Sequence, residues 1–367
     1  EDTDTRPFIV LGTRPEIIKL APVIHEFERR GVEYCLLHTG QHYSEELSEK
    51  FFHDMRLKRP DITLDVGSGT HAEQTAKAMV GIEKELIRTR PDVVLVQGDT
   101  NTTLSAALAA AKLRIPIGHI EAGLRSYDRR MPEEHNRRLT DHISDYLFAP
   151  TERAAETLRR EDVWGEIFVT GNTVIDAIED ALRRMTGQSR IVSELGLNDF
   201  MLMTLHRAEN VDDKDTLAGI LEGVLSIGRH IVFPVHPRTR DRLTRFGLMD
   251  RIQKTDKMTL IEPPGYLDFL SLLAGCSFVL TDSGGIQEEV TAPSINKRVF
   301  VLRTSTERPE AVESGHAVVV GVDPAGIRQG VEEGIRTWDG APRRCPFGSG
   351  DASVRIADIL ERRIGNL

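Results

Sequence analysis

The stretch Cys276-Ser277-Phe278-Val279-Leu280-Thr281-Asp282-Ser283-Gly284-Gly285-Ile286-Gln287-Glu288-Glu289 carries the strongest fold signal in the chain. An apolar run typical of a buried strand ends at Leu280, two glycines follow, and a helix-forming segment begins. Backbone N–H groups at the start of such a helix, together with its dipole, favour an anion such as phosphate. Because glycine has no Cβ, a phosphate can approach residues 283–285 closely. Glu289 is placed to accept hydrogen bonds from paired hydroxyls, as on a ribose. The stretch indicates either a nucleotide site or an ordinary strand-to-helix turn.

Short β-rich runs alternate with helical stretches along nearly the whole chain of 367 residues. This alternation predicts right-handed βαβ units and parallel sheets. Strands are expected at residues 8–11, 34–38, 93–97, 117–120, 146–148, 201–205, 231–235, 278–280, 299–302 and 317–320. Helices are expected between them, for example at residues 15–30, 72–89, 102–113 and 216–227. These strands are too many for one comfortable sheet, so the pattern favours two similarly built domains.

The boundary between the two domains is expected near residues 171–190, where a polar stretch separates the two alternating series. We therefore predict an N-terminal domain of residues 1–175 and a C-terminal domain of residues 176–352. Each should be a Rossmann-like α/β domain with a doubly wound parallel sheet. An amphipathic stretch at residues 353–367 is predicted to form a helix that packs back on the first domain.

The composition argues against several classes of protein. A formal net charge of −10 disfavours nucleic-acid binding, which needs a basic surface. No apolar run approaches the roughly 20 residues of a membrane-spanning helix, so no membrane partner is expected. Three widely spaced cysteines suggest neither a disulfide framework nor a zinc site, and they fit a reducing cytoplasm. The chain has no metal-binding motif, no GxGxxG turn and no Walker A loop, so we expect no metal and no cofactor.

Polar and charged residues follow the predicted carboxyl ends of strand after strand. Ligands of open α/β sheets bind at that edge, and in a two-domain protein a ligand can bridge the cleft between two such edges. The segments concerned are Gly12-Thr13-Arg14-Pro15-Glu16, Thr39-Gly40-Gln41-His42, Gly98-Asp99-Thr100, Glu121-Ala122-Gly123-Leu124-Arg125, His206-Arg207 and Asp282-Ser283-Gly284-Gly285. Their recurrence at one edge favours a ligand site over ordinary solvated loops.

Three acidic residues of the first half are candidate proton carriers: Asp99, Glu121 and Glu133. Each also has a structural interpretation. Asp99 is suited to cap the following helix, Glu121 to pair with Arg125, and Glu133 to pair with Arg137 one helical turn later. If the three acids gather in one cleft, their like charges raise the pKa of at least one, which can then hold a proton near neutrality.

Several basic residues are candidate anion contacts. Arg14 stands at the positive end of a predicted helix, and Lys19 lies one turn later with its side chain leaning toward the same end. His206 and Arg207 follow a strand and offer a donor and a fixed cation, well suited to a diphosphate. Arg308 precedes Pro309, which is expected to begin another helix. The alternatives are a solvated surface lysine for Lys19 and a structural histidine for His206.

Two predicted helices carry apolar residues of uncertain role. The helix that begins at Pro132 is expected to bury Leu139 and Ile143 in a stripe beside Glu133 and Arg137. In the second half, Tyr266 and Phe269 either stack on a nucleobase or pack against their own helix.

Taken together, the motifs resemble the non-hydrolysing UDP-N-acetylglucosamine 2-epimerases. The resemblance runs from about Phe8 to the C-terminal helix. It rests on Gly12-Thr13-Arg14-Pro15-Glu16, Gly98-Asp99-Thr100, Glu121-Ala122-Gly123-Leu124-Arg125, Pro132-Glu133-Glu134, Gly171-Asn172-Thr173 and the stretch from Asp282 to Glu289. It implies the GT-B architecture, with two Rossmann-like domains and an active site in the cleft between them. It also implies interconversion of UDP-N-acetylglucosamine and UDP-N-acetylmannosamine, usually by a homodimer.

The resemblance carries over to individual residues. Asp99, Glu121 and Glu133 match the family's catalytic carboxylates, and His206 matches its catalytic-site histidine. The positions that match substrate contacts are Arg14, Lys19, Arg137, Ser283, Gly284, Gly285, Glu289 and Arg308, with Phe269 near the uracil. The implied reaction expels UDP to form 2-acetamidoglucal and then adds it back, which explains a set of cations for the diphosphate and carboxylates for the proton.

Some positions depart from the family pattern. Ile295-Asn296-Lys297-Arg298-Val299 replaces the usual Gly-Lys-Pro-Val and is about two residues longer. Gln41 and His42 fit the loop with which some bacterial members bind an activating second substrate molecule, whereas Ser44 and the arginine-free residues 62–70 do not. Allosteric activation is therefore left open.

Other functions compete with the epimerase interpretation. Relatives that act on diacetamido-uronates tend to carry Ala-Arg-Pro-Gln at the first turn, so Gly12-Thr13-Arg14-Pro15-Glu16 disfavours them. A GT-B glycosyltransferase would share the donor site but need an acceptor. A catalytically silent UDP-sugar sensor would need no acid cluster.

Overall fold

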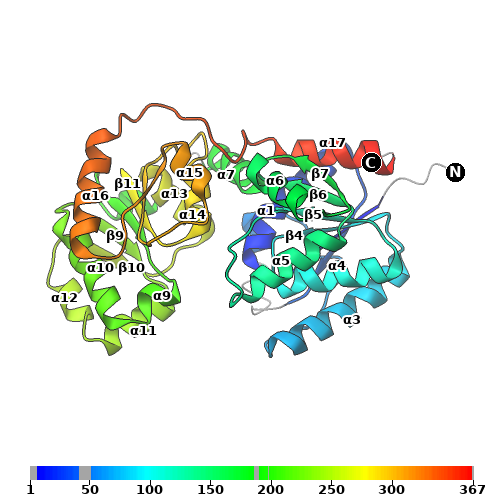
Figure 1. Ribbon diagram of the computed structural model, residues 1–367, viewed down its shortest axis with the longest axis horizontal. Helices are drawn as coiled ribbons and strands as arrows, with labels where there is room; N and C mark the ends of the chain where they lie inside the picture. The colour runs from blue at the N-terminus through cyan, green and yellow to red at the C-terminus, as the bar shows by residue number, and fades with distance from the viewer. Residues whose placement is uncertain (1–5, 41–50, 186–189, 197, 366–367) are drawn as a thin grey trace. The chain divides into compact units, whose positions relative to one another are not determined.

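The computed structural model describes residues 6–40, 51–185, 190–196 and 198–365 (Figure 1). The chain forms two compact units, one of residues 1–177 with 347–367 and the other of residues 178–346. Each unit is a parallel sheet flanked by helices. The two-sheet α/β fold predicted from the strand–helix alternation is confirmed. Within the described residues, no helix is both long and apolar enough to cross a membrane.

The first unit contains a seven-stranded parallel sheet with the order β3-β2-β1-β4-β5-β6-β7. Its strands are β1 (Pro7–Leu11), β2 (Cys35–His38), β3 (Ile62–Thr63), β4 (Val93–Gln97), β5 (Ile117–Ile120), β6 (Tyr146–Ala149) and β7 (Glu166–Val169). Its helices are α1 (Arg14–Arg30), α3 (His71–Thr89), α4 (Asn101–Leu113), α5 (Pro132–Ile143), α6 (Glu152–Arg160), α7 (Thr173–Arg184, which runs into the second unit) and α17 (Ala352–Ile364). The strand order reverses between β1 and β4, which is where ligands of such sheets bind.

The second unit contains a six-stranded parallel sheet with the order β10-β9-β8-β11-β12-β13. Its strands are β8 (Met201–Thr204), β9 (Ile231–Pro234), β10 (Met258–Ile261), β11 (Phe278–Thr281), β12 (Val299–Val301) and β13 (Ala317–Val319). Its helices are α8 (Ile191–Glu194), α9 (Ala208–Val211), α10 (Lys214–Ser226), α11 (Pro237–Arg245), α12 (Met249–Gln253), α13 (Tyr266–Gly275), α14 (Gly284–Glu289), α15 (Pro309–Glu313) and α16 (Pro324–Thr337). Here the order reverses between β8 and β11.

Each sheet is covered by an apolar core. In the first unit, α3 and α4 lie side by side over one face of the sheet (Figure 1). There Ile82 and Leu86 of α3 and the alanines of α4 pack on the strand residues Phe8, Val10 and Val94. The small side chains of α4 let it approach the sheet closely. In the second unit, α10 and α16 lie side by side and bury Leu217, Leu221 and Ile327 against Met203 and Phe233.

The C-terminal helix α17 belongs to the first unit and packs on α1. Arg30 of α1 forms ion pairs with Asp358 at 2.6 Å and Glu361 at 2.9 Å. The carboxylate of Asp176 accepts hydrogen bonds from the backbone N–H groups of Ala352 and Ser353, at 3.2 and 2.8 Å, and so satisfies the start of α17.

Three strands were missed by the sequence prediction: β3, β7 and β10. Each lies at an edge of its sheet, where one side of a strand faces no neighbour. Their residues are mostly half-buried or exposed, so they lack the continuous apolar run that marks a central strand such as β4.

The expected burial of Leu139 is wrong, because its side chain is 53% exposed. Helix α5 instead buries polar residues: Glu134, Asn136, Thr140 and Asp141. Ile143, the other residue of the predicted stripe, is partly buried against the core. The hydrophobic pattern gave the wrong face because the inner face of α5 is held by hydrogen bonds rather than by apolar contact.

His316 makes folding stability depend on pH in the second unit. It is fully buried, and its ring nitrogens lie 2.8 Å from Ser314 Oγ and 3.2 Å from Asn296 Oδ1. Burial lowers the pKa of His316 to about 4, and the charges of Arg343 and Arg298 act in the same direction. As the pH falls below about 6.5, the unfolded chain takes up a proton that the folded chain refuses until about pH 4, so stability is lost across this window.

We predict that lowering the pH from 7 to 5 reduces the stability of the second unit through this residue by about 2 kcal/mol. His316→Gln, which retains a donor toward Asn296, should lose less. Urea unfolding followed by the fluorescence of Trp338, whose ring lies 6.2 Å from that of His316, measures this difference. Equal losses in both proteins would contradict the prediction.

Candidate active site

The turn after β1 is organised by the buried carboxylate of Glu16. Its Oε2 accepts hydrogen bonds from the backbone N–H groups of Gly12 at 2.9 Å and Thr13 at 2.7 Å. Its Oε1 accepts hydrogen bonds from the hydroxyls of Thr100 at 2.7 Å and Thr103 at 3.1 Å, beyond β4. Burial raises the pKa of Glu16, although these hydrogen bonds oppose the shift. Glu16 therefore joins the two strand ends at the reversal point of the sheet.

The N–H groups of Gly12 and Thr13, just before α1, bind the protein's own carboxylate. The role of Arg14 as an anion contact stays a prediction. Arg14 points its guanidinium over the ring of Phe51, 4.7 Å from the ring centroid.

Glu121 and Lys19 form an ion pair with a distance of 2.5 Å between Nζ and Oε2. Both side chains are largely buried. Asn172 Nδ2 also donates to Glu121 Oε2, at 3.1 Å. The expected partner of Glu121, Arg125, instead pairs with Asp141 at 2.7 Å. Lys19 therefore meets a carboxylate, where the sequence suggested an anionic ligand.

The backbone at Glu121 has a φ of 71°, in the left-handed region that residues other than glycine rarely adopt. The backbone N–H groups of Glu121 and Ala122 both donate to the carbonyl of Phe148, at 3.1 Å, and hold this conformation. Such strained residues cluster at functional sites, where the surrounding structure fixes them.

Asp99 forms an ion pair with Arg137, which also donates to Glu134 at 3.1 Å. Asn136 fixes the same turn, because its side chain donates to the Asp99 carbonyl at 3.0 Å. These contacts differ from the two structural alternatives considered for Asp99 and Glu133. The cap of α4 is Thr100 rather than Asp99, and the helical partner of Arg137 is Glu134 rather than Glu133, which is only partly buried.

The two ion pairs lie at the ends of neighbouring strands. Gln97, the last residue of β4, pairs with Ile120, the last residue of β5. Asp99 and Glu121 therefore follow adjacent strand ends by two residues and one residue. Of the predicted site residues, Lys19 contacts Glu121 and Arg137 contacts Asp99. Glu133 lies on α5, the same helix as Arg137.

In the second unit, the buried carboxylate of Asp282 organises the reversal point of the sheet. It accepts hydrogen bonds from the backbone N–H groups of His206 at 3.0 Å and Arg207 at 2.8 Å, and from the side chain of Asn210 at 3.2 Å. The His206 ring nitrogen Nδ1 lies 3.3 Å from the same carboxylate. Partial burial lowers the pKa of His206, while the charge of Asp282 opposes this shift.

Two arginines flank the Ser-Gly-Gly turn. A Cβ atom added at Gly284 would lie 3.7 Å from the guanidinium carbon of Arg308 and 3.8 Å from Nη2 of Arg207. Arg308 is itself held by an ion pair with the buried Glu288. Ser283 precedes α14 without a side-chain cap. The turn thus presents backbone N–H groups between two cations, an arrangement that favours a phosphate.

The remaining predicted positions of the second unit lie on α13 and α14. Glu289 ends α14, with its Oε1 3.9 Å from a Cβ position on Gly285. On α13, Tyr266 is buried and packs in the protein, whereas Phe269 is only partly buried. Gln41 and His42 lie outside the described residues.

Sequence reasoning assigned no individual role to four residues that organise the site: Glu16, Asn172, Glu134 and Asp282. All four belong to quoted motifs, so their positions were noticed but their partners were not. Glu16 had a readable signal, because Thr followed three residues later by Glu is the capping-box pattern. Glu134 binds Ser126 and Arg137 close by in the chain, whereas the contacts of Asn172 and Asp282 join segments far apart and depend on the sheet order.

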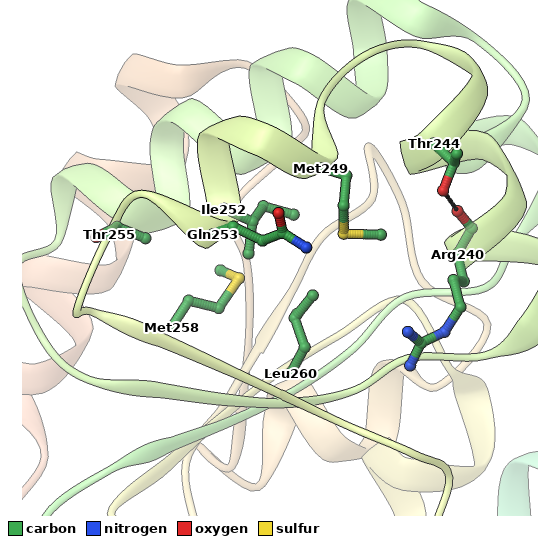
Figure 2. Close-up of a pocket in the computed structure, with 8 residues that line it drawn as sticks. All are labelled: Arg240, Thr244, Met249, Ile252, Gln253, Thr255, Met258 and Leu260. Atoms are coloured by element: carbon green, nitrogen blue, oxygen red, sulfur yellow. Dashed lines mark hydrogen bonds between the residues drawn. The ribbon is translucent and has the colours of Figure 1, made fainter.

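A cavity of about 350 Å³ in the second unit is lined by residues of α11, α12 and β10 and by Thr255 (Figure 2). Met249, Met258 and Leu260 point into it, and Arg240 lies at its side. None of the predicted site residues lines this cavity. We therefore do not assign it to the active site.

Two Rossmann-like parallel-sheet units, with carboxylates at the strand ends of one and cations around a Ser-Gly-Gly turn in the other, define a nucleotide-sugar protein of the GT-B class. The model of the UDP-N-acetylglucosamine 2-epimerase family matches residues 25–361. The chain belongs to this family.

Individual relatives agree with this assignment. The UDP-N-acetylglucosamine 2-epimerase of Methanocaldococcus jannaschii is 47% identical over 96% of this chain and 98% of its own length. The UDP-2,3-diacetamido-2,3-dideoxy-D-glucuronate 2-epimerase of Pseudomonas aeruginosa is 40% identical over 96% of this chain and 98% of its own length.

Solved structures show the same fold. The M. jannaschii UDP-GlcNAc 2-epimerase in complex with UDP-GlcNAc and UDP matches with a TM-score of 0.87 and 46% identity, covering 98% of this chain and 100% of its own. A glycosyltransferase from Rickettsia africae matches with a TM-score of 0.61 at 11% identity, which shows a shared fold alone. The predicted GT-B architecture is confirmed.

Proposed function

We propose that this protein catalyses the reversible C2 epimerisation of UDP-N-acetylglucosamine to UDP-N-acetylmannosamine. Beyond family membership, the observation that carries the proposal is the pair of carboxylate–cation contacts, Glu121 with Lys19 and Asp99 with Arg137, at adjacent strand ends. A protein that only bound the nucleotide sugar would need no such pair of acids.

The reaction that suits these residues is elimination followed by re-addition. The C2 hydrogen of the substrate lies beside no carbonyl, so direct deprotonation is unfavourable. Departure of UDP from C1 develops positive charge on the sugar and makes the C2 proton acidic enough to remove. The products are UDP and 2-acetamidoglucal, and addition of UDP with proton delivery to the opposite face of C2 gives the epimer.

Two or more carboxylates are needed because inversion requires proton transfer on both faces of the sugar. We assign this role to Asp99, Glu121 and Glu133. Lys19 and Arg137 hold the first two in fixed orientations through their ion pairs.

The cations of the second unit suit the departing diphosphate. Arg308, the hydroxyl of Ser283 and the backbone N–H groups of Gly284 and Gly285 are assigned to the phosphates, with His206 as a donor to the leaving oxygen. Further assignments follow the family resemblance: Glu289 to the ribose hydroxyls, Phe269 to the uracil, and Arg14 to the substrate.

Incubation with UDP-N-acetylglucosamine in D₂O tests the proposed reaction. We expect NMR to show UDP-N-acetylmannosamine with deuterium at C2, because the proton exchanges with solvent while the glycal is bound. UDP-2,3-diacetamido-glucuronate, tested in parallel, should react far more slowly. Binding without product or deuterium would indicate a sensor, and sugar transfer to an added acceptor would indicate a glycosyltransferase.

Removing the charge from either paired carboxylate should abolish most of the activity. Glu121→Gln and Asp99→Asn keep side-chain size but cannot take a proton, so each should lower kcat by roughly 10²–10⁴-fold. The affinity for UDP, measured by calorimetry, should stay nearly unchanged. Glu156→Gln is a matched control, because Glu156 forms only an exposed ion pair with Arg160 on α6. Near-normal turnover in both active-site variants would exclude their proposed role.

We also propose that two copies of the chain associate through the outer face of α3. Val80 and Ile87 of this helix are 50% and 56% exposed, and Leu139 of α5 is 53% exposed. A largely apolar cavity of about 510 Å³ lies between α3 and the start of α5. Lys84 is exposed between Val80 and Ile87, but exposed apolar side chains gathered on one helix face are commonly covered by a partner. The cytoplasmic location remains a prediction from the cysteine content.

Light scattering of the purified protein tests the association. We expect the mass of a dimer, and the double variant Val80→Lys/Ile87→Lys should be monomeric because it places charge on the apolar face. A change at two exposed positions elsewhere, Arg153→Lys and Arg328→Lys, is the control. A monomeric wild-type protein, or an unaltered dimer in the double variant, would contradict this surface.

A further inference from the structure

His119 is a buried histidine of β5 that lies two residues before Glu121. Its side chain is fully buried. Nδ1 lies 2.7 Å from Asp141 Oδ1, and Nε2 lies 2.7 Å from the Gly98 carbonyl oxygen. A carbonyl oxygen can only accept a hydrogen bond, so Nε2 carries a proton.

The second ring nitrogen also faces an acceptor. Burial alone would raise the pKa of Asp141, but the hydrogen bonds and charges of His119 and Arg125 hold it below its usual range. The carboxylate is therefore ionised and accepts a hydrogen bond from Nδ1. Both ring nitrogens of His119 thus face hydrogen-bond acceptors, the Asp141 carboxylate and the Gly98 carbonyl.

The contacts of His119 join the three segments that carry the candidate proton carriers. Gly98 immediately precedes Asp99, and His119 itself precedes Glu121 on the neighbouring strand. Asp141 lies on α5, four residues after Arg137 and eight after Glu133, so all three share one side of the helix. A single ring thus contacts the turn after β4 and the helix α5 from its place on β5.

The same network extends to the loop after Glu121. Asp141 Oδ2 accepts hydrogen bonds from the Gly123 N–H at 3.2 Å and from Arg125 at 2.7 Å. Arg125 also forms a two-pronged contact with Glu161, at 3.0 and 2.7 Å. Arg125 thus pairs with both carboxylates, Asp141 and Glu161, and ties α5 to the loop after Glu121.

Stability alone does not explain a buried, hydrogen-bonded histidine at this position. Replacing a buried ion pair by apolar residues of similar volume is often neutral or stabilising. The neighbouring core positions of β4 and β5, such as Val94, Val96 and Ile117, are apolar. An apolar side chain cannot bind both the Gly98 carbonyl and the carboxylate of Asp141 on α5, whereas His119 contacts both.

We propose that His119 is a positioning residue, which holds the Asp99 turn and helix α5 in place relative to Glu121 by donating to both Gly98 and Asp141. This inference rests on the proposed epimerase function of the three carboxylates. His119 does not touch the substrate in this proposal. Its effect is to keep the carboxylates within the narrow range of positions that proton transfer requires.

Three substitutions of His119 test its two hydrogen bonds one at a time and together. The amide nitrogen of glutamine takes nearly the place of Nε2, so His119→Gln retains the donor to Gly98. The amide nitrogen of asparagine takes nearly the place of Nδ1, so His119→Asn retains the donor to Asp141. His119→Phe keeps the ring shape and removes both donors. His316→Gln alters an equally buried histidine of the second unit that contacts none of these segments.

We expect His119→Phe to lower kcat by roughly 100-fold, while KM and the affinity for UDP change by less than about threefold. His119→Gln should recover most of the loss and His119→Asn only part of it, because the bond to Gly98 is the one that fixes the Asp99 turn. His316→Gln should leave kcat unchanged even where it lowers the melting temperature as much as His119→Phe does.

Amide hydrogen exchange gives a second readout that does not depend on turnover. In the full chain, residues 98–101 and 121–125 should exchange faster in His119→Phe than in wild type, and His119→Gln should restore protection at residues 98–101. A kcat within threefold of wild type in a folded His119→Phe variant would overturn the inference. The inference would also be overturned if the kcat losses of the variants simply followed their melting temperatures. Unchanged amide exchange at residues 98–101 and 121–125 would overturn it as well. A wild-type protein that fails to epimerise would instead overturn the proposed function, and the exchange measurement would still decide the positioning role.

Discussion

The first unit depends on one buried carboxylate, that of Glu16, placed where the strand order of the sheet reverses. Two backbone N–H groups from the turn after β1 and two threonine hydroxyls from beyond β4 donate to it. A carboxylate can accept several hydrogen bonds, whereas an apolar residue would leave these donors unsatisfied inside the protein. The turn that precedes Arg14 and Lys19 and the turn that contains Asp99 are therefore held to each other by a single side chain. The positions of both site ion pairs follow from this constraint.

The second unit uses Asp282 in the same way, but the result differs. Asp282 joins the turns after β8 and β11 by accepting the N–H groups of His206 and Arg207. In the first unit, Glu16 lies on the helix itself and satisfies that helix's own start. In the second, Ser283 forms no side-chain cap on α14, and Arg207 and Arg308 flank Gly284. Both carboxylates thus link two strand-end turns, and in the second unit the Ser-Gly-Gly turn also lies beside two arginines. This difference supports the proposed division, in which the second unit holds the diphosphate and the first moves the proton.

Much of this could be predicted from the sequence, and the failures have a common cause. Central strands and long helices were found because burial on both faces produces apolar runs, whereas edge strands such as β7 are too exposed to do so. Many candidate site residues, such as Asp99, Glu121 and His206, could be proposed because they stand in motifs at strand ends. Their ion-pair partners could not be predicted, because the pairings offered as structural alternatives joined residues close in the chain. Glu121 pairs with Lys19, 102 residues away, and Arg137 pairs with Asp99, 38 residues away. Such pairings depend on the order of strands in the sheet, which local patterns do not contain.

Helix α5 shows why the local pattern also gave the wrong face. Its buried side carries Glu134, Asn136 and Asp141, whose partners are Ser126, the Asp99 carbonyl and His119. An apolar face packs almost equally well after a small slide along the sheet, because dispersion and burial are not directional. Hydrogen bonds at 2.7 to 3.0 Å do not permit such a slide, because they weaken steeply with distance and angle. A helix that carries Glu133 and Arg137 must be fixed in register, so the residues that would normally form its core-facing stripe are polar. Because polar residues fill the buried side of α5, the apolar Leu139 lies on its outer, exposed side.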